Sequence, residues 1–224
     1  MLAVAPMMIK PLLADREDMN EQDKRIRESA TTLQEIMNAG DRSIPEDLIR
    51  RAQCVVIVPN LKRAGFIIGG KYGKGIMTCR TANASGWSAP AIMRIEGGSI
   101  GLQIGAGETD VVMLVMNPSG KEKLLHDKFT VGADAAVMAG PVGRNAQAAT
   151  DAAMHAEILA WSRSRGVFGG ITLEGATLRP DRDDDAKLYG RSLPTREIVN
   201  GDIRPPAAAS ELYSELNHYP YREK

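Results

Sequence analysis

The sequence feature that most constrains this chain is a glycine-rich stretch from Pro59 to Gly107 that contains no acidic residue before Glu96. Ten of its glycines interrupt short apolar, alternating segments: Gly65, Gly69, Gly70, Gly73, Gly75, Gly97, Gly98, Gly101, Gly105 and Gly107. Glycine inside such segments is typical of bulges, bends or close backbone approach within a sheet. We therefore predict an α+β fold, with a curved, glycine-kinked antiparallel sheet or barrel packed by N-terminal helices.

The same stretch is basic, which predicts a surface that faces an anion. Its cations are Lys62, Arg63, Lys71, Lys74, Arg80 and Arg94. A local excess of one charge on a protein of formal net charge +0 indicates an anion-facing patch. Successive strand residues point to opposite faces, so all six cannot share one surface. We select those nearest the expected turns as candidate lipid-binding residues: Lys62, Arg63, Lys71 and Lys74. The alternative is that they are ordinary exposed charges.

Composition excludes several other classes of protein. A formal net charge of +0 argues against a general nucleic-acid binder, and an aromatic content of 4% argues against base-stacking platforms. The three histidines are far apart in sequence and the two cysteines are too few for a four-cysteine zinc site, so we expect no metal. The sequence contains no apolar run of the roughly 18 residues that a membrane span needs.

Local patterns give the expected elements. A helix is predicted from Asn20 to Gly40, with Asn20 as its N-cap. The apolar run from Cys54 to Val58 predicts a strand that Pro59 ends. A hairpin is predicted next, with strands over residues 65–71 and 75–80 joined at Tyr72-Gly73-Lys74. Gly97 and Gly98 predict a bend.

We expect three parts along the chain. Residues 1–19 are an apolar segment interrupted by prolines, and they are the remnant of a signal, an interfacial anchor or a disordered end. Residues 20–190 form the main domain, and residues 191–224 form a tail with short helical turns.

Cys54 and Cys79 lie within or at the end of expected strands. If these strands are neighbours with side chains in phase, their Cα atoms come within disulfide range. In an exported protein the pair would be oxidised, whereas in a cytosolic protein both would remain buried thiols.

Three short motifs resemble sites without meeting their requirements. Residues 97–101 read G-x-S-x-G, yet a nucleophile elbow needs a helix after its serine, and a strand is expected there. Residues 69–75 lack the spacing of a phosphate loop. Asp181, Asp183 and Asp185 alternate as in a calcium loop, but Ala186 and Ser192 stand where glycine and glutamate are needed. We expect no enzymatic activity and no cofactor.

Four longer blocks carry a family resemblance. They are GFIIGGKYGKGIMTCR, GWSAPAIMRIEGGSIGLQIGAGETDVVMLVMN, FTVGADAAVMAGPVGR and SRSRGVFGGITLEGATL, which begin at Gly65, Gly86, Phe129 and Ser162. In order and spacing they resemble the SYLF domain, a lipid-binding domain that is also called an actin-binding domain. The resemblance covers roughly residues 26–190.

The resemblance implies binding of phospholipids, notably phosphatidylinositol lipids in eukaryotic members, and no established catalysis. We read the chain as a bacterial-type, single-domain member that is exported to the periplasm or envelope, or otherwise cytoplasmic. The expected function is a non-catalytic module that binds an anionic phospholipid membrane surface through its basic loop residues. The alternative is a structural or protein-binding domain that serves the envelope or a filament. We expect no nucleic-acid partner.

Overall fold

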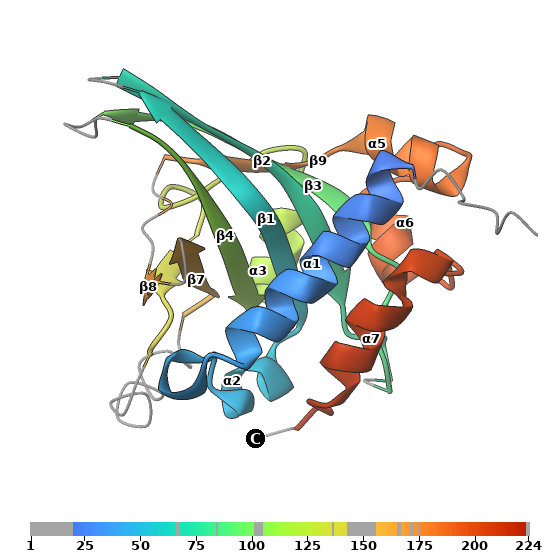
Figure 1. Ribbon diagram of the computed structural model, residues 1–224. Coiled ribbons are helices and arrows are strands. Elements are labelled where there is room, and N and C mark those ends of the chain that lie inside the picture. Colours follow the sequence, from blue (N-terminus) through green and yellow to red (C-terminus); the bar gives the residue numbers. More distant parts are fainter. Residues whose placement is uncertain are drawn as a thin grey trace, which may run out of the picture.

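The computed structural model describes residues 20–65, 68–83, 85–100, 105–135, 137–142, 156–164, 167–170, 173 and 175–222 (Figure 1). Within these residues one curved sheet runs in the order β5-β9-β3-β2-β1-β4-β7-β6, with β8 paired to β7. Its strands are β1 (Cys54–Gly65), β2 (Ile68–Cys79), β3 (Ala91–Ile100), β4 (Gly105–Val115), β5 (Phe129–Thr130), β6 (Val137–Ala139), β7 (Ile158–Ser164), β8 (Val167–Gly170) and β9 (Thr177–Pro180). Every pair is antiparallel except β6 with β7.

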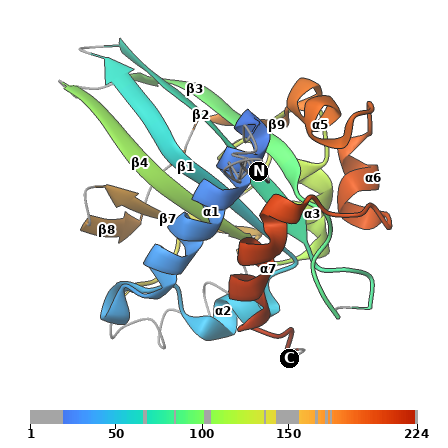
Figure 2. The same cartoon turned by 45° about the vertical axis from the view of Figure 1, so that its right-hand side comes forward.

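Helices cover both faces of this sheet. They are α1 (Glu21–Met37), α2 (Glu46–Arg51), α3 (Pro118–Leu124), α5 (Arg182–Tyr189), α6 (Thr195–Asn200) and α7 (Ser210–Asn217), with 3-10 turns η1 (Gly40–Arg42) and η2 (Ala207–Ala209). Helices α1 and α7 lie side by side across one face in both ribbon views (Figures 1 and 2). The predicted α+β class, with a curved sheet packed by helices, is confirmed.

Helix α1 forms because its apolar residues recur on one side. Ile26, Leu33 and Ile36 are fully buried against the sheet. As predicted, the side chain of Asn20 caps the helix by accepting a hydrogen bond from the Asp23 amide at 2.7 Å. The helix ends at Met37, and Gly40, with φ of +62°, lies in the turn that follows.

The sheet separates two apolar cores. One packs α1, α2 and α7 against alternate strand residues such as Val55 and Ile57, and we call this side the helix face. The other packs α3, α6, β5 and β9 against the intervening residues, including Val56 and Met77, and we call it the inner face. This alternation assigns the face of each residue in the regular parts of the strands.

Two predictions about β1 and β2 are wrong. Pro59 does not end β1, because the strand continues to Gly65 through a bulge between Val58 and Leu61. Proline is tolerated at a bulge, where its missing N–H group is not needed to pair with a neighbouring strand. No hairpin turn occurs at Tyr72-Gly73-Lys74, because β2 is continuous from Ile68 to Cys79. The connection between β1 and β2 falls at residues 66–67, outside the described residues.

Glycine at position 75 explains how β2 passes the bulge. A Cβ atom at Gly75 would lie 1.9 Å from the carbonyl oxygen of Ile57, and one at Gly73 would lie 2.9 Å from Leu61 Cδ1. Glycine is therefore required here for close approach between strands, not for a turn. Gly97 and Gly98 likewise lie inside β3, so the predicted bend between two strands is also wrong.

The four central strands project past the elements that flank them (Figure 1). Strand β9 pairs with β3 only up to Glu96, and β7 pairs with β4 only from Asp110. We call the projecting part, residues 62–65, 68–72, 96–100 and 105–108, the wing.

Residues 191–222, which we expected to form a tail, contribute to both cores. Ile198 and Val199 of α6 pack on the inner face, while Leu212 and Leu216 of α7 pack on the helix face. Helix α6 is one of the short helical turns that were expected in this part of the chain. Residues 1–19, which were expected to form a separate N-terminal segment, lie outside the described residues.

Candidate functional site

The structure separates the four basic residues that the sequence grouped together. Lys62 pairs in register with Tyr72, and Arg63 pairs with Lys71. By the alternation along each strand, Lys62 and Lys74 lie on the helix face, whereas Arg63 and Lys71 lie on the inner face. The four residues therefore lie on two different surfaces, not on one anion-facing patch.

Lys74 is held in an ion-pair network. Its ammonium nitrogen lies 2.6 Å from Asp184 Oδ2 and 2.8 Å from Asp181 Oδ2, both at the start of α5. Burial alone would lower the pKa of Lys74, but the hydrogen bonds to these two carboxylates raise it. The side chain is 20% exposed, and the two carboxylates neutralise its charge within the fold. Asp184 lies 110 residues away in sequence, so local patterns do not reveal this pairing.

Arg63 and Lys71 form a pair of like charges on the wing. They are directly opposite each other on β1 and β2, and both side chains are half-buried. Burial and the neighbouring Arg63 charge lower the pKa of Lys71. The Nε atom of Arg63 is buried and has no hydrogen-bond acceptor among the described residues.

Such a pair is unfavourable in isolation, because like charges directly opposite across two strands repel each other. Within the described part of the chain, Arg63 and Lys71 form no ion pair with a carboxylate. Their neighbours in register are Gly107 on β4, beside which the space is open, and Gly97 on β3, which the backbone of Ala176 covers. The arrangement is suited to an external anionic group.

The helix face of the wing is open and mixed in charge. Tyr72 is 47% exposed, and Lys62 is also exposed. Their register neighbours are Glu96 on β3 and Glu108 on β4. Lys62 is therefore flanked in register by a carboxylate, unlike the pair on the inner face.

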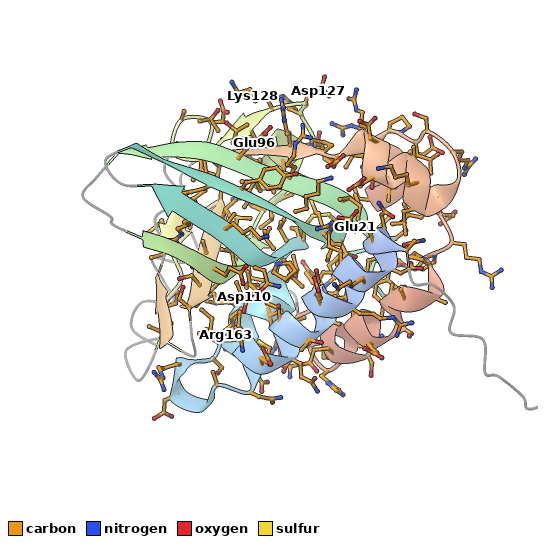
Figure 3. The ribbon with its side chains drawn as sticks, turned by 45° about the horizontal axis from the view of Figure 1, so that its top comes forward. Glu21, Glu96, Asp110, Asp127, Lys128 and Arg163 are labelled. Atoms are coloured by element: carbon orange, nitrogen blue, oxygen red, sulfur yellow. A yellow bond between two sulfur atoms is a disulfide. The ribbon has the colours of Figure 1, made fainter. Side chains whose placement is uncertain are left out.

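A polar network next to the wing fixes the bulge (Figure 3). Asn60 has φ of +52°, a left-handed conformation, and its amide donates to Asp110 Oδ1 at 2.9 Å. Arg163 donates to Asp110 Oδ2 at 2.6 Å and also pairs with Glu35 of α1. This network sets the direction in which β1 continues into the wing, and sequence analysis did not single it out.

Cys54 and Cys79 are directly opposite each other at the proximal ends of β1 and β2. Their sulfur atoms are bonded at 2.08 Å, and both residues are fully buried. The bond links the strands at the end opposite the wing.

The rejected motifs have structural roles or lie in regular structure. Ser99 lies inside β3, not at a strand-to-helix turn. Asp181 caps α5, and Asp185 accepts the Ile92 amide at 2.7 Å. Within the described residues, the acidic, histidine and cysteine side chains form no cluster suited to a metal ion. The helices described here are all too short or too polar to cross a bilayer.

Comparison with known proteins agrees with a binding role. Residues 96–219 match the family described as Ysc84, Las17-binding protein actin regulator. The chain is 34% identical over 180 residues to LAS seventeen-binding protein 3 of Saccharomyces cerevisiae, which covers 79% of this chain and 39% of the yeast protein. It is 31% identical over 183 residues to SH3 domain-containing YSC84-like protein 1 of Rattus norvegicus, covering 81% of this chain and 53% of the rat protein.

A protein of the same name from Xenopus laevis is 29% identical over 214 residues, covering 95% of this chain and 63% of the frog protein. The chain thus spans less than two thirds of the length of these relatives. They are named for binding or for an SH3 domain, in agreement with the prediction of no enzymatic activity. All three are eukaryotic, so the expected bacterial type is not borne out and export gains no support. The family match confirms the resemblance to the SYLF domain, and the chain belongs to the Ysc84 family.

Proposed function

We propose that this chain is a non-catalytic binding domain of an actin-regulating assembly, and that it docks an acidic surface of a protein partner on Arg63 and Lys71 of the wing. The observation that carries the proposal is the pair itself. Two half-buried cations are directly opposite each other, and no carboxylate pairs with either of them among the described residues. The family description, Las17-binding protein actin regulator, supports a protein partner.

The geometry of the wing favours docking of a large partner. Its strands extend beyond the flanking elements, so a partner reaches the wing without meeting the helices (Figure 1). The bulge network of Asn60, Asp110 and Arg163 holds the base of the wing, and the disulfide of Cys54 and Cys79 links the other end of the same strands. A preorganised surface loses less conformational entropy on binding.

The direct test is sedimentation of the purified chain with actin filaments and, separately, capture by purified Las17. We expect binding to at least one of them, weakening as salt rises, because exposed charges are screened within about 8 Å at physiological ionic strength. Absence of binding to both proteins at low salt would contradict the protein-partner proposal.

An anionic phospholipid surface is a second candidate ligand. The observation in its favour is Tyr72, which is 47% exposed on the wing beside Lys62, since tyrosine and lysine together suit a membrane interface. Each cation near an anionic leaflet contributes about 1 kcal/mol. Flotation with phosphatidylserine or phosphatidylinositol vesicles, compared with phosphatidylcholine vesicles, tests this candidate. Equal flotation with both kinds of vesicle would contradict it.

A further inference from the structure

Arg80, which directly follows β2, is a buried cation that forms no ion pair with an acidic residue among the residues that the structure describes. The residue is 7% exposed, and its Nη2 atom donates to the backbone carbonyl oxygens of Tyr219 at 2.7 Å and of Ile49 at 3.5 Å. Its Nε atom is buried without an acceptor, and no carboxylate forms an ion pair with Arg80 in the part of the chain that the structure describes. Buried charges are usually paired, whereas the carboxylates among the described residues leave this guanidinium without an ion pair.

Aromatic rings form the walls around this guanidinium. Its Cζ atom lies 3.9 Å from the centre of the Trp87 ring and 5.8 Å from the centre of the Tyr221 ring. We call these three side chains the Arg80 slot. Contact with ring faces stabilises a cation only partly. Because the rings compensate only partly for the loss of water, burial lowers the pKa of Arg80 to about 10.

The last described residues hold Tyr221 at this slot. The Arg222 amide donates to the carbonyl oxygen of Arg50 in α2 at 3.2 Å. Both ribbon views place the C-terminal end beside α2 (Figures 1 and 2). On the other side, the Arg80 amide donates to the Gln53 carbonyl oxygen at 2.8 Å, next to the Cys54–Cys79 bond. The cation and the tyrosine are thus held from opposite sides.

Tyr221 is the residue placed to supply an anion. It is only half-buried, and its ring centre lies 5.8 Å from the guanidinium carbon. A negative charge on its phenol opposes the lowering of the Arg80 pKa that burial causes. Tyr219 is less suited, because its hydroxyl donates to Glu215 at 3.4 Å and a second anion there would meet that carboxylate.

We propose that the Arg80 slot is an oxyanion site, and that Tyr221 supplies the oxyanion once its hydroxyl is phosphorylated. A protein tyrosine kinase would transfer the γ-phosphoryl group of ATP to Tyr221 Oη. The bond from the γ-phosphorus to the bridging oxygen breaks, the Oη–P bond forms, ADP leaves and the phenolic proton passes to a base of the kinase. The phosphate carries a charge of about −1.5 to −2 and three acceptor oxygens, which suit a planar guanidinium.

The test uses the full chain with phosphotyrosine encoded at position 221. Phosphorus NMR measures the second pKa of the phosphate, which is about 6 for a free phosphate ester. The matched reference is a synthetic peptide of residues 217–224 phosphorylated at Tyr221, which has the same local sequence and no Arg80 slot. We expect the phosphate pKa in the full chain to be lower than in the peptide by about half a unit or more, because a neighbouring cation favours the dianion.

A second sample carries Arg80→Gln together with the phosphotyrosine, and its phosphate pKa should return to the peptide value. Equal pKa values in the full chain and the peptide would overturn the proposal. So would a lowered pKa that Arg80→Gln leaves unchanged. If Arg80→Gln does not fold, hydrogen exchange of the Arg222 amide in the unsubstituted chain decides instead. Phosphorylation should slow this exchange, and faster exchange would overturn the proposal.

Discussion

Single glycines in β2 and β4 show that the same residue type has different physical roles at different positions. At Gly75 a Cβ atom would lie 1.9 Å from a backbone oxygen of β1, which cannot move without disturbing the bulge. At Gly107, on the wing, a Cβ atom would meet nothing within 4 Å. The first glycine is required for packing within the chain, and the second leaves open space beside Arg63.

We predict that Gly75→Ala destabilises the protein by about 3 kcal/mol or prevents folding, because the new methyl group overlaps the backbone of β1. Gly107→Ala is the matched control, and it should change the free energy of unfolding by less than about 1 kcal/mol. Chemical denaturation of the two variants and the parent measures the difference. Similar stabilities for both variants would show that β1 and β2 are not packed as described.

The two cysteines give a second prediction at this scale. The disulfide closes a loop with a sequence separation of 25 residues. Replacing both Cys54 and Cys79 with serine should reduce the free energy of unfolding by about 3 kcal/mol, chiefly because the unfolded chain gains freedom. Denaturation of the parent with and without a reductant provides an independent measurement. If neither treatment changes stability, the bond makes no contribution in solution.

Among the elements, α5 is tied to the sheet mainly by carboxylates. Asp184 and Asp181 bind Lys74 of β2, and Asp185 accepts the Ile92 amide of β3. Burial raises the pKa of Asp185 to about 7, and the charges of Asp181 and Asp184 add to the rise. Burial opposes the shift at Asp184, but hydrogen bonds from Lys74 and Lys187 lower its pKa to about 2.

These opposite shifts predict the pH dependence of stability. The folded state holds the Asp185 proton more tightly than the unfolded state, so this contribution is lost as pH rises from about 4 to about 7. Asp185→Asn keeps an oxygen to accept the Ile92 amide and removes the ionisation. We expect the variant to be more stable than the parent at pH 8, by on the order of a few kcal/mol, and less dependent on pH between 5 and 8.

Thermal unfolding of both proteins across this pH range measures the effect. If the parent gains as much stability between pH 5 and pH 8 as Asp185→Asn does, the assignment of a raised pKa to Asp185 is contradicted. The Asp184 contribution acts in the other direction, because stability is lost as pH falls from about 4 to about 2.

Elements with strong local signals could be predicted from the sequence, whereas the course of β1 and β2 could not. Helix α1 was predictable because a capping asparagine and a regular apolar face both indicate it. The bulge after Val58 depends on Asp110 and Arg163, which are distant in sequence, so Pro59 was misread as the end of a strand. Glycines needed for close strand packing look the same in sequence as glycines needed for turns.

At the scale of the whole molecule, one sheet joins a body with two buried cores to a projecting wing. The body contains both cores and the proximal ends of the strands. The distal ends of β1 and β2 carry Arg63 and Lys71 in the part of the sheet that β7 and β9 do not reach. Sequence analysis found the basic stretch, but it could not assign Lys74 to an acidic partner or place Lys62 on the other face. These assignments depend on the register of β1 and β2 and on the position of α5.

The most direct test of the binding proposal compares charge reversals on the two faces of the wing. One variant carries Arg63→Glu with Lys71→Glu, and the matched control carries Lys62→Glu, the adjacent residue on the opposite face. The measurement is the dissociation constant for the protein partner that binds the parent, with folding checked by thermal unfolding. We predict at least about tenfold weaker binding for the double variant and less than about threefold for the control. Equal affinity of the double variant and the parent, with both folded, would contradict the assignment of binding to Arg63 and Lys71.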